Sequence, residues 1–316
     1  MNLYNSLAVI WLQYDRLVAM KLISFRNFLM TLFSMTCLLF IALVIIIAIL
    51  FRNFLGKYNL QNINLLGSKD MFSIDTQNTH LGLKDKNIIV KFAIISDTES
   101  DWEALKSALN KIKGENVVYV FHLGDITQLG VPEDLQKAKG IFAESGLDVY
   151  SIPGDRDLWK SKGIDGYNLA MGEDYGYRMV SGINILLINN SDEYEGIGQE
   201  QFNYISENIN NSDFVMLHNP IHFDAFPLVG SKGMGEYSEE VNDQRLALLG
   251  MIRNSTVKAV FAGDQHFFRE AVDLERPGLY YYFMGALTQK RQIQLPSYAV
   301  VTVYEDGDYT VTKTPL

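Results

Sequence analysis

Five short polar segments constrain the fold of this chain more than any other feature of its sequence. Each directly follows a short apolar run, and they are Ser96–Glu99, Leu123–Asp125, Gly154–Asp157, Leu217–Pro220 and Gly263–His266. Every segment contains a carboxylate or a histidine. In open α/β sheets, ligands bind beyond the carboxyl ends of the strands. The segments therefore predict a layered α/β domain with one site to which several strands contribute.

Secondary structure after Lys86 is predicted from the spacing of apolar residues. Short apolar runs, typical of buried strands, occur at 87–96, 117–123, 147–152, 214–217, 257–262, 280–283, 298–304 and 309–312. Amphipathic stretches with helical spacing occur at 101–112, 133–145, 199–208 and 238–253. Residues 177–188 indicate a hairpin, because Ser181 and Gly182 form a turn signal. We therefore expect an α/β (α+β) fold, a four-layer α/β/β/α sandwich of two mixed β-sheets flanked by helices.

The composition of the chain limits its chemistry. Its 316 residues carry a formal net charge of −10 with a pI near 5.0, so binding to a nucleic-acid backbone is not expected. The single cysteine, Cys37, lies in the most apolar stretch, which excludes a disulfide framework and a thiolate metal site. Any metal ion must therefore be held by oxygen and imidazole ligands.

A transmembrane helix is predicted ahead of the domain. Residues 28–51 carry no charge and, at 1.5 Å per residue, could cross a hydrocarbon core of roughly 30 Å. Three basic residues precede this span and two follow it, so the positive-inside rule predicts a single-pass protein of the cell membrane with an extracytoplasmic C-terminal domain. A domain without cysteine is compatible with either side. The predicted parts are an N-terminal segment at 1–27, the span at 28–51, a membrane-proximal linker at 52–86 and one domain at 87–316.

The five polar segments resemble the motifs of the calcineurin-like metallophosphoesterases, over nearly everything from about residue 88 to 316. That family carries an Asp-x-His segment, a Gly-Asp, a Gly-Asn-His-Asp/Glu, a lone His and a Gly-His-x-His at successive strand ends. This chain has Asp97-x-Glu99, Gly124-Asp125, Gly154-Asp155-Arg156-Asp157, His218 and Gly263-Asp264-x-His266 in the same order. Each motif is a weak signal alone, but five in order are hard to obtain by chance.

The resemblance implies a binuclear metal centre that is bridged by Asp125. One metal ion would be held by Asp97, Glu99, Asp125 and His266, and the other by Asp125, Asp155, His218 and Asp264. The implied activity is that of a metal-dependent phosphoesterase, which hydrolyses a phosphate mono- or diester through a bridging hydroxide. The predicted span would anchor this enzyme to the membrane. The implied substrate is a phosphoester whose identity the loop sequences do not reveal.

Three of the implied ligands differ from the family pattern, and each still offers a carboxylate. They are Glu99, Asp155 and Asp264. The family's two carboxylates, one amide and four imidazoles become five carboxylates and two imidazoles, so two divalent cations would leave the site near −1 instead of near +2. Such a site should prefer hard cations such as manganese, iron or magnesium; calcium would also fit, and zinc would fit less well.

Arg156 stands where the family has a histidine that is thought to protonate the leaving group. Arginine cannot donate this proton, since its pKa lies above about 12, but it can stabilise negative charge on phosphoryl oxygens. Losing a general acid typically costs about 10²–10⁴-fold in rate, so we expect slow hydrolysis that favours good leaving groups. Asp157 either orients Arg156 or caps the following turn, and the sequence favours neither role.

Other functions stay open at this point. The domain could be a catalytically degenerate module that binds a ligand or partner at the membrane, with Arg156 joining Glu99 and Asp264 in a metal-free ionic network. It could also be regulated by calcium in its carboxylate-rich pocket. His122, two residues before Gly124 on a strand, is interpreted as a core histidine rather than a metal ligand.

Overall fold

The computed structural model describes residues 86–222, 233–290 and 294–316, all of which belong to one unit, Asp75–Leu316. The predicted segments at 1–27 and 28–51, and all of the linker except Lys86, lie outside the described residues. Within the described ranges, no helix is long and apolar enough to cross a membrane. The expectations for the N-terminal part of the chain therefore stay predictions.

The first sheet has the strand order β11-β10-β1-β2-β3. The strands are β1 (Ile88–Ile95), β2 (Tyr119–His122), β3 (Asp148–Ser151), β10 (Ser297–Tyr304) and β11 (Tyr309–Pro315). β1, β2 and β3 run parallel, joined through α2 (Trp102–Gly114) and α3 (Pro132–Ser145), whereas β10 and β11 pair antiparallel. Ile95, His122 and Ser151 lie side by side in register, so the chain leaves these three strands at the same edge.

The second sheet has the strand order β4-β5-β6-β7-β9-β8. The strands are β4 (Gly176–Val180), β5 (Ile183–Leu187), β6 (Phe214–Leu217), β7 (Ala259–Ala262), β8 (Arg269–Val272) and β9 (Tyr280–Phe283). β5, β6, β7 and β9 are parallel to their neighbours, and β4 and β8 are antiparallel strands at the two edges. Leu217 pairs with Ala262, so the segments after β6 and β7 begin together.

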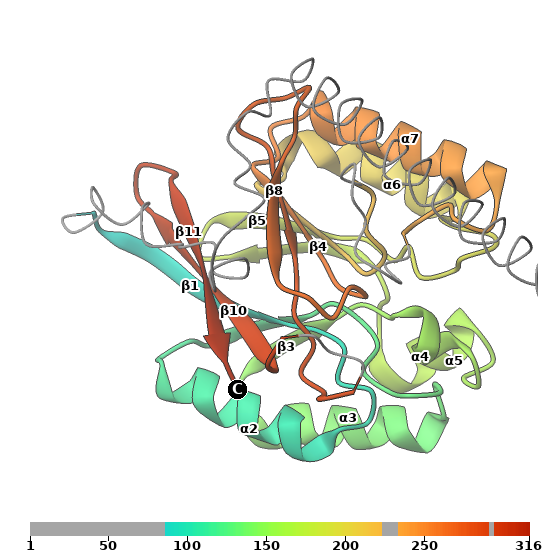
Figure 1. Cartoon of the computed structure of the whole chain (residues 1–316), viewed down its shortest axis with the longest axis vertical. Coiled ribbons are helices and arrows are strands. Elements are labelled where there is room, and N and C mark those ends of the chain that lie inside the picture. Colours follow the sequence, from blue (N-terminus) through green and yellow to red (C-terminus); the bar gives the residue numbers. More distant parts are fainter. Residues whose placement is uncertain (1–85, 223–232, 291–293) are drawn as a thin grey trace, which may run out of the picture. The chain divides into compact units, whose positions relative to one another are not determined.

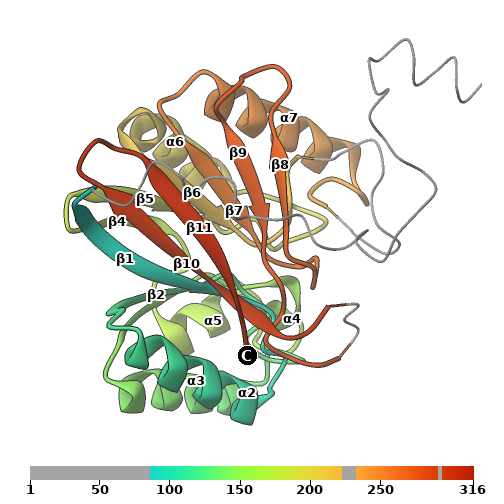
Figure 2. The same ribbon diagram turned by 60° about the vertical axis from the view of Figure 1, so that its left-hand side comes forward.

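The two sheets pack face to face, and helices cover their outer faces (Figures 1 and 2). α2, α3 and α5 (Ile164–Met171) pack on the first sheet, and α6 (Gln199–Asn208) and α7 (Glu239–Arg253) pack on the second. Between the sheets, Phe92 of β1 meets Phe214 of β6 with ring centroids 5.9 Å apart. The expected four-layer arrangement of two mixed sheets flanked by helices is therefore confirmed for the described domain.

Local sequence explains where the long helices begin. Asp101 caps α2 by accepting a hydrogen bond from the backbone N–H of Ala104, and Ser238 caps α7 in the same way through Val241. β8, α4 (Asp155–Leu158) and α5 were not expected from the sequence. The two helices have eight residues or fewer, too short for a helical period to be recognised, and the sequence of β8, Arg-Glu-Ala-Val, is not an apolar run.

Candidate metal centre

The structure brings all seven predicted metal ligands together at the carboxyl ends of five strands. Loops after β1, β2 and β3 of the first sheet supply Asp97, Glu99, Asp125 and Asp155. Loops after β6 and β7 of the second sheet supply His218, Asp264 and His266. The site therefore lies where the carboxyl ends of strands from both sheets come together.

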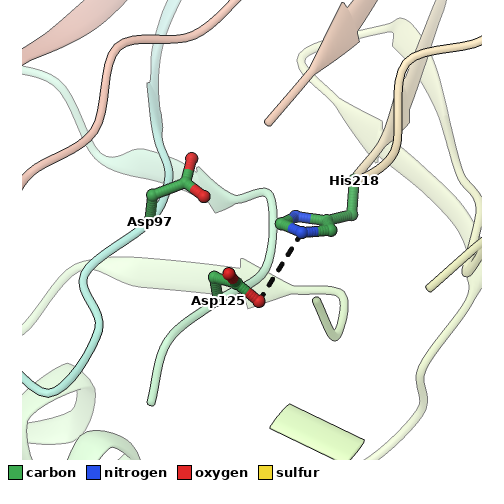
Figure 3. A group of neighbouring side chains, drawn as sticks. All are labelled: Asp97, Asp125 and His218. Atoms are coloured by element: carbon green, nitrogen blue, oxygen red, sulfur yellow. Dashed lines mark ion pairs between the residues drawn. The ribbon is translucent and has the colours of Figure 1, made fainter. Parts of the chain in front are cut away.

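His218 is at the centre of this cluster. Its Nε2 atom lies 3.5 Å from Oδ1 of Asp125 and 3.6 Å from Oδ1 of Asp155. Two groups of potential ligand atoms, each within 4.8 Å of one another, share this histidine: Asp97, Asp125 and His218, and Asp155, His218 and Asp264. Figure 3 shows the first group: the His218 ring points toward the two carboxylates, which come from the other sheet, and a dashed line marks its ion pair with Asp125.

Glu99 and His266 complete the other half of the cluster. Nε2 of His266 lies 3.5 Å from Oδ1 of Asp97 and 3.4 Å from Oε1 of Glu99. These separations fit two ligand atoms around one ion that holds each at about 2.1 Å. By distance alone, this half could also bind a cation.

Both histidines are oriented by backbone carbonyl groups. Nδ1 of His218 contacts the carbonyl oxygen of Leu123 at 2.7 Å, and Nδ1 of His266 contacts that of Lys290 at 3.2 Å. A carbonyl oxygen can only accept a hydrogen bond, so each Nδ1 carries the proton. In a neutral imidazole, Nε2 then keeps its lone pair, the arrangement that metal-binding histidines need.

Several buried polar atoms in the cluster have no hydrogen-bond partner among the described residues. They are both carboxylate oxygens of Asp97 and Nε2 of His218. Burying a polar atom without a partner costs about 1–3 kcal/mol, and more for a charged group. A cation would satisfy these atoms, so the donor set fits a metal ion.

The charges of the cluster point the same way. Burial raises the pKa of Asp264 to about 7 and the pKa of Asp125 well above its usual range. Burial would lower the pKa of His266, but the nearby Asp97 carboxylate outweighs it and raises that pKa to about 9. Without a cation the cluster would therefore retain protons at neutral pH. A bound metal ion would displace them and supply the positive charge.

The backbone of the site is strained. Five of the seven predicted ligands have φ angles between +46° and +62°, and they are Asp97, Glu99, Asp125, Asp264 and His266. A residue with a side chain pays of order 1 kcal/mol or more for this left-handed conformation, and such residues concentrate at functional sites. Two hydrogen bonds help to hold the strain, from the Asp97 N–H to the Gly124 carbonyl (3.1 Å) and from the Glu99 N–H to the Asp125 carbonyl (2.9 Å).

Two glycines allow the loops to approach one another. A Cβ at Gly124 would lie 2.7 Å from Nδ1 of His218, and a Cβ at Gly154 would lie 2.2 Å from Oδ1 of Asp125. Neither contact is sterically allowed, and Gly124 also has a φ of +94°. These two motif positions must therefore be glycine for the loops to pack as they do.

Arg156 reaches into the cluster from the start of α4. Its Nε atom lies 3.4 Å from Oε1 of Glu99 and 3.2 Å from Oδ2 of Asp125. In the metal-free network considered from the sequence, the partners of Arg156 are Glu99 and Asp264. Among the described residues, Arg156 pairs with Glu99 as expected, but its second partner is Asp125. The reason is local, because the Arg156 backbone N–H also donates to Oδ1 of Asp125 at 3.1 Å and brings the two residues together.

Asp157 is fully buried and holds two loops together. Oδ2 accepts hydrogen bonds from the backbone N–H groups of Ile126 and Gly154, both at 3.0 Å. Oδ1 accepts from the backbone N–H and the hydroxyl of Thr127, both at 2.8 Å. With four donors on its two oxygens, Asp157 is better explained as a cap that positions the Asp125 loop than as a residue that orients Arg156.

Supporting residues lie directly behind the ligands. His122 is buried, accepts a hydrogen bond from the Gly124 N–H at Nδ1 and contacts the Thr98 hydroxyl with Nε2 at 2.8 Å, as expected for a core histidine. The sequence reasoning missed Asn190, whose Oδ1 accepts from the backbone N–H groups of His218 and Asn219, both at 3.0 Å. A polar residue soon after the buried strand β5 was the available signal.

The chain is similar to known phosphoesterases in its sequence family and in its fold. The family model described as "Calcineurin-like phosphoesterase superfamily domain" matches residues 90–306. Among solved structures, a dimetal phosphatase from Danio rerio has a TM-score of 0.56 and 15% identity, over 72% of this chain and 97% of that one. A purple acid phosphatase from yellow lupin (Lupinus luteus) seeds has a TM-score of 0.55 and 10% identity, over 72% of this chain and 51% of that one. At these identities the likeness concerns the fold. No curated protein sequence matches the chain.

Proposed function

Since the chain belongs to the calcineurin-like phosphoesterase superfamily, we propose that it is a metal-dependent phosphoesterase that hydrolyses a phosphate mono- or diester. The observation that carries this proposal is the buried cluster of Asp97, Asp125 and His218. Its carboxylates come from one sheet and its imidazole from the other, and several of its atoms have no hydrogen-bond partner among the described residues. A purely structural core would not leave such atoms unsatisfied.

A divalent cation in this cluster would polarise a phosphoryl oxygen and make a water molecule a better nucleophile at neutral pH. The candidate ligands are the seven residues of the cluster. Because five of them are carboxylates, we propose hard cations, namely manganese, iron or magnesium, with calcium also compatible and zinc less suitable.

The chain's own residues would then bind and neutralise the phosphate. Arg156 carries a permanent positive charge beside the cluster, and its guanidinium can donate hydrogen bonds to phosphoryl oxygens. It cannot protonate a leaving group. We therefore propose that esters with good leaving groups, such as nitrophenols, are cleaved much faster than simple alkyl esters.

We also propose that residues 28–51 hold the enzyme at the cell membrane, with the domain on the extracytoplasmic side. This part of the proposal is supported by the uncharged apolar sequence of the span and by the basic residues before it. Protease treatment of intact cells tests it, because an extracytoplasmic domain would be cut and a cytoplasmic one would be protected.

The activity is tested by incubating the purified chain with bis(p-nitrophenyl) phosphate and a panel of divalent and ferric ions. We expect metal-dependent release of nitrophenol that EDTA abolishes. Asp125→Asn should abolish it as well, whereas Asp243→Asn, the same change at an exposed position of α7, should not. Absence of turnover with every metal would rule out the proposed activity on this substrate class.

A second function is favoured by one observation. Arg156 already pairs with two carboxylates of the cluster, which could make the domain a metal-free module that binds a ligand or partner. This alternative predicts a folded chain that retains no metal after equilibrium dialysis.

A further inference from the structure

We propose that Arg156 takes the place of one of the two metal ions implied by the family pattern, so that the site binds a single divalent cation at the half that contains His218. The inference rests on the proposed function, because it concerns the same metal centre. It departs from the family pattern in the number of ions and in the role of the arginine.

The guanidinium lies where the first of the two ions would have to be. That ion would be held by Glu99 and Asp125 together with Asp97 and His266. A hard cation keeps carboxylate oxygens within about 2.0–2.6 Å. Nε of Arg156 is already 3.4 Å from Oε1 of Glu99 and 3.2 Å from Oδ2 of Asp125, so it contacts two oxygens that the ion would also have to contact. Two positive groups cannot share this space, because their repulsion is strong in a water-poor site.

Arg156 is fixed in this position from several sides. Its backbone N–H donates to Oδ1 of Asp125, and its guanidinium carbon lies 4.9 Å from the ring centre of Trp159. The adjacent Asp157 is anchored by four hydrogen bonds. The side chains of Glu99 and Asp125 are only 1% and 3% exposed, and buried carboxylates of this kind need a permanent positive partner.

The half that contains His218 is left complete. Asp155, His218 and Asp264 place one ligand atom each within 4.8 Å of one another. Asp125 can add its Oδ1 atom, which lies 3.5 Å from Nε2 of His218, because the guanidinium contacts the other oxygen. Three carboxylates and one imidazole would surround the ion, a donor set that suits manganese or magnesium.

The number of bound ions tests this inference directly. The full chain is dialysed to equilibrium against Mn²⁺, and the manganese bound per chain is measured by elemental analysis. We expect one equivalent in the wild type and two in Arg156→His, which restores the family residue. Two equivalents in the wild type would overturn the inference and leave the proposed function standing. One equivalent in both proteins would also overturn it, and none in the wild type would contradict the proposed function itself.

A second set of variants separates the two halves of the site and does not depend on the folding of Arg156→His. Glu99→Gln should keep the single equivalent, because in the wild type Glu99 pairs with Arg156 rather than with the ion. Asp264→Asn should lose most of it, since Asp264 belongs to the other half. Loss of the ion in Glu99→Gln, with retention in Asp264→Asn, would place the cation at the wrong half and overturn the inference. Circular dichroism of each variant checks that it is folded.

Discussion

Replacing Asp157 with asparagine should destabilise the domain strongly, although the two side chains have nearly the same shape. Each carboxylate oxygen of Asp157 accepts two hydrogen bonds. The four donors belong to buried residues, so water cannot replace a lost acceptor. Asparagine offers one oxygen and one NH₂ group. Whichever way the amide is turned, at least one buried backbone N–H loses its acceptor and faces another donor.

The magnitude follows from this count. One orphaned buried donor costs about 1–3 kcal/mol, and the surviving bonds lose the extra strength that a charged acceptor gives. We therefore expect the free energy of unfolding to fall by about 2–5 kcal/mol. With a urea m-value of about 2–3 kcal/mol per molar, the unfolding midpoint should fall by about 1–2 M.

The assay is urea unfolding of the purified protein, followed by circular dichroism, with Asp243→Asn as the matched control at an exposed position of α7. The control should change the free energy of unfolding by less than about 0.5 kcal/mol. If Asp157→Asn behaved like the control, the structural role would be refuted. Loss of hydrolysis in a variant of normal stability would indicate instead that Asp157 acts on Arg156 or on the substrate.

Three further predictions concern His122, the pH dependence of metal binding, and Asp273. Burial lowers the pKa of His122 to about 3, so its imidazole is neutral and accepts a hydrogen bond from the Gly124 N–H. His122→Phe leaves this N–H without an acceptor, and the free energy of unfolding in urea should fall by about 2–4 kcal/mol. An unchanged midpoint would contradict this role. Burial raises the pKa of Asp264 to about 7 without a cation, so protons compete with the metal at this ligand. Mn²⁺ affinity measured by calorimetry should therefore increase from about pH 6 to about pH 8 with proton release, and a pH-independent affinity would show that Asp264 does not bind the ion. Burial opposes ionisation of Asp273, but its ion pair with an arginine and its other hydrogen bonds lower its pKa to about 2. The ionised carboxylate therefore stabilises the fold above the unfolded pKa of about 3.9, and this stabilisation is lost as the pH falls through about 2. Asp273→Asn should cost about 1–3 kcal/mol at about pH 7 in thermal unfolding, and its difference from the wild type should shrink below about pH 4.

Much of the fold could be predicted because the strands that matter are short apolar runs with polar ends. The strand ending at Ile95 and the strand ending at Leu217 were recognised from this pattern, and both carry site residues beyond their ends. Parallel pairing then brings the ends to one edge without further information. β8 was missed because its sequence, Arg-Glu-Ala-Val, is not an apolar run, whereas the equally short β6 is fully apolar.

The contacts within the site were less predictable than its members. The second carboxylate partner of Arg156 depends on the left-handed backbone at Asp125 and on the turn into α4, neither of which leaves a period in the sequence. The role of Asp157 was undecided for a similar reason, since a carboxylate at this position suits a cap and a side-chain partner equally well. Asn190 was missed because an asparagine after a strand is an ordinary loop residue until its hydrogen bonds are known.

The central claim is that the strand-end cluster binds a catalytic cation. Anomalous diffraction at the manganese edge, from crystals grown with Mn²⁺, tests it most directly. The account predicts a peak next to Nε2 of His218, within coordination distance of Asp155 and Asp264. Crystals that contain manganese in the solution and show no peak at this cluster, with Arg156 still paired to Glu99 and Asp125, would contradict it.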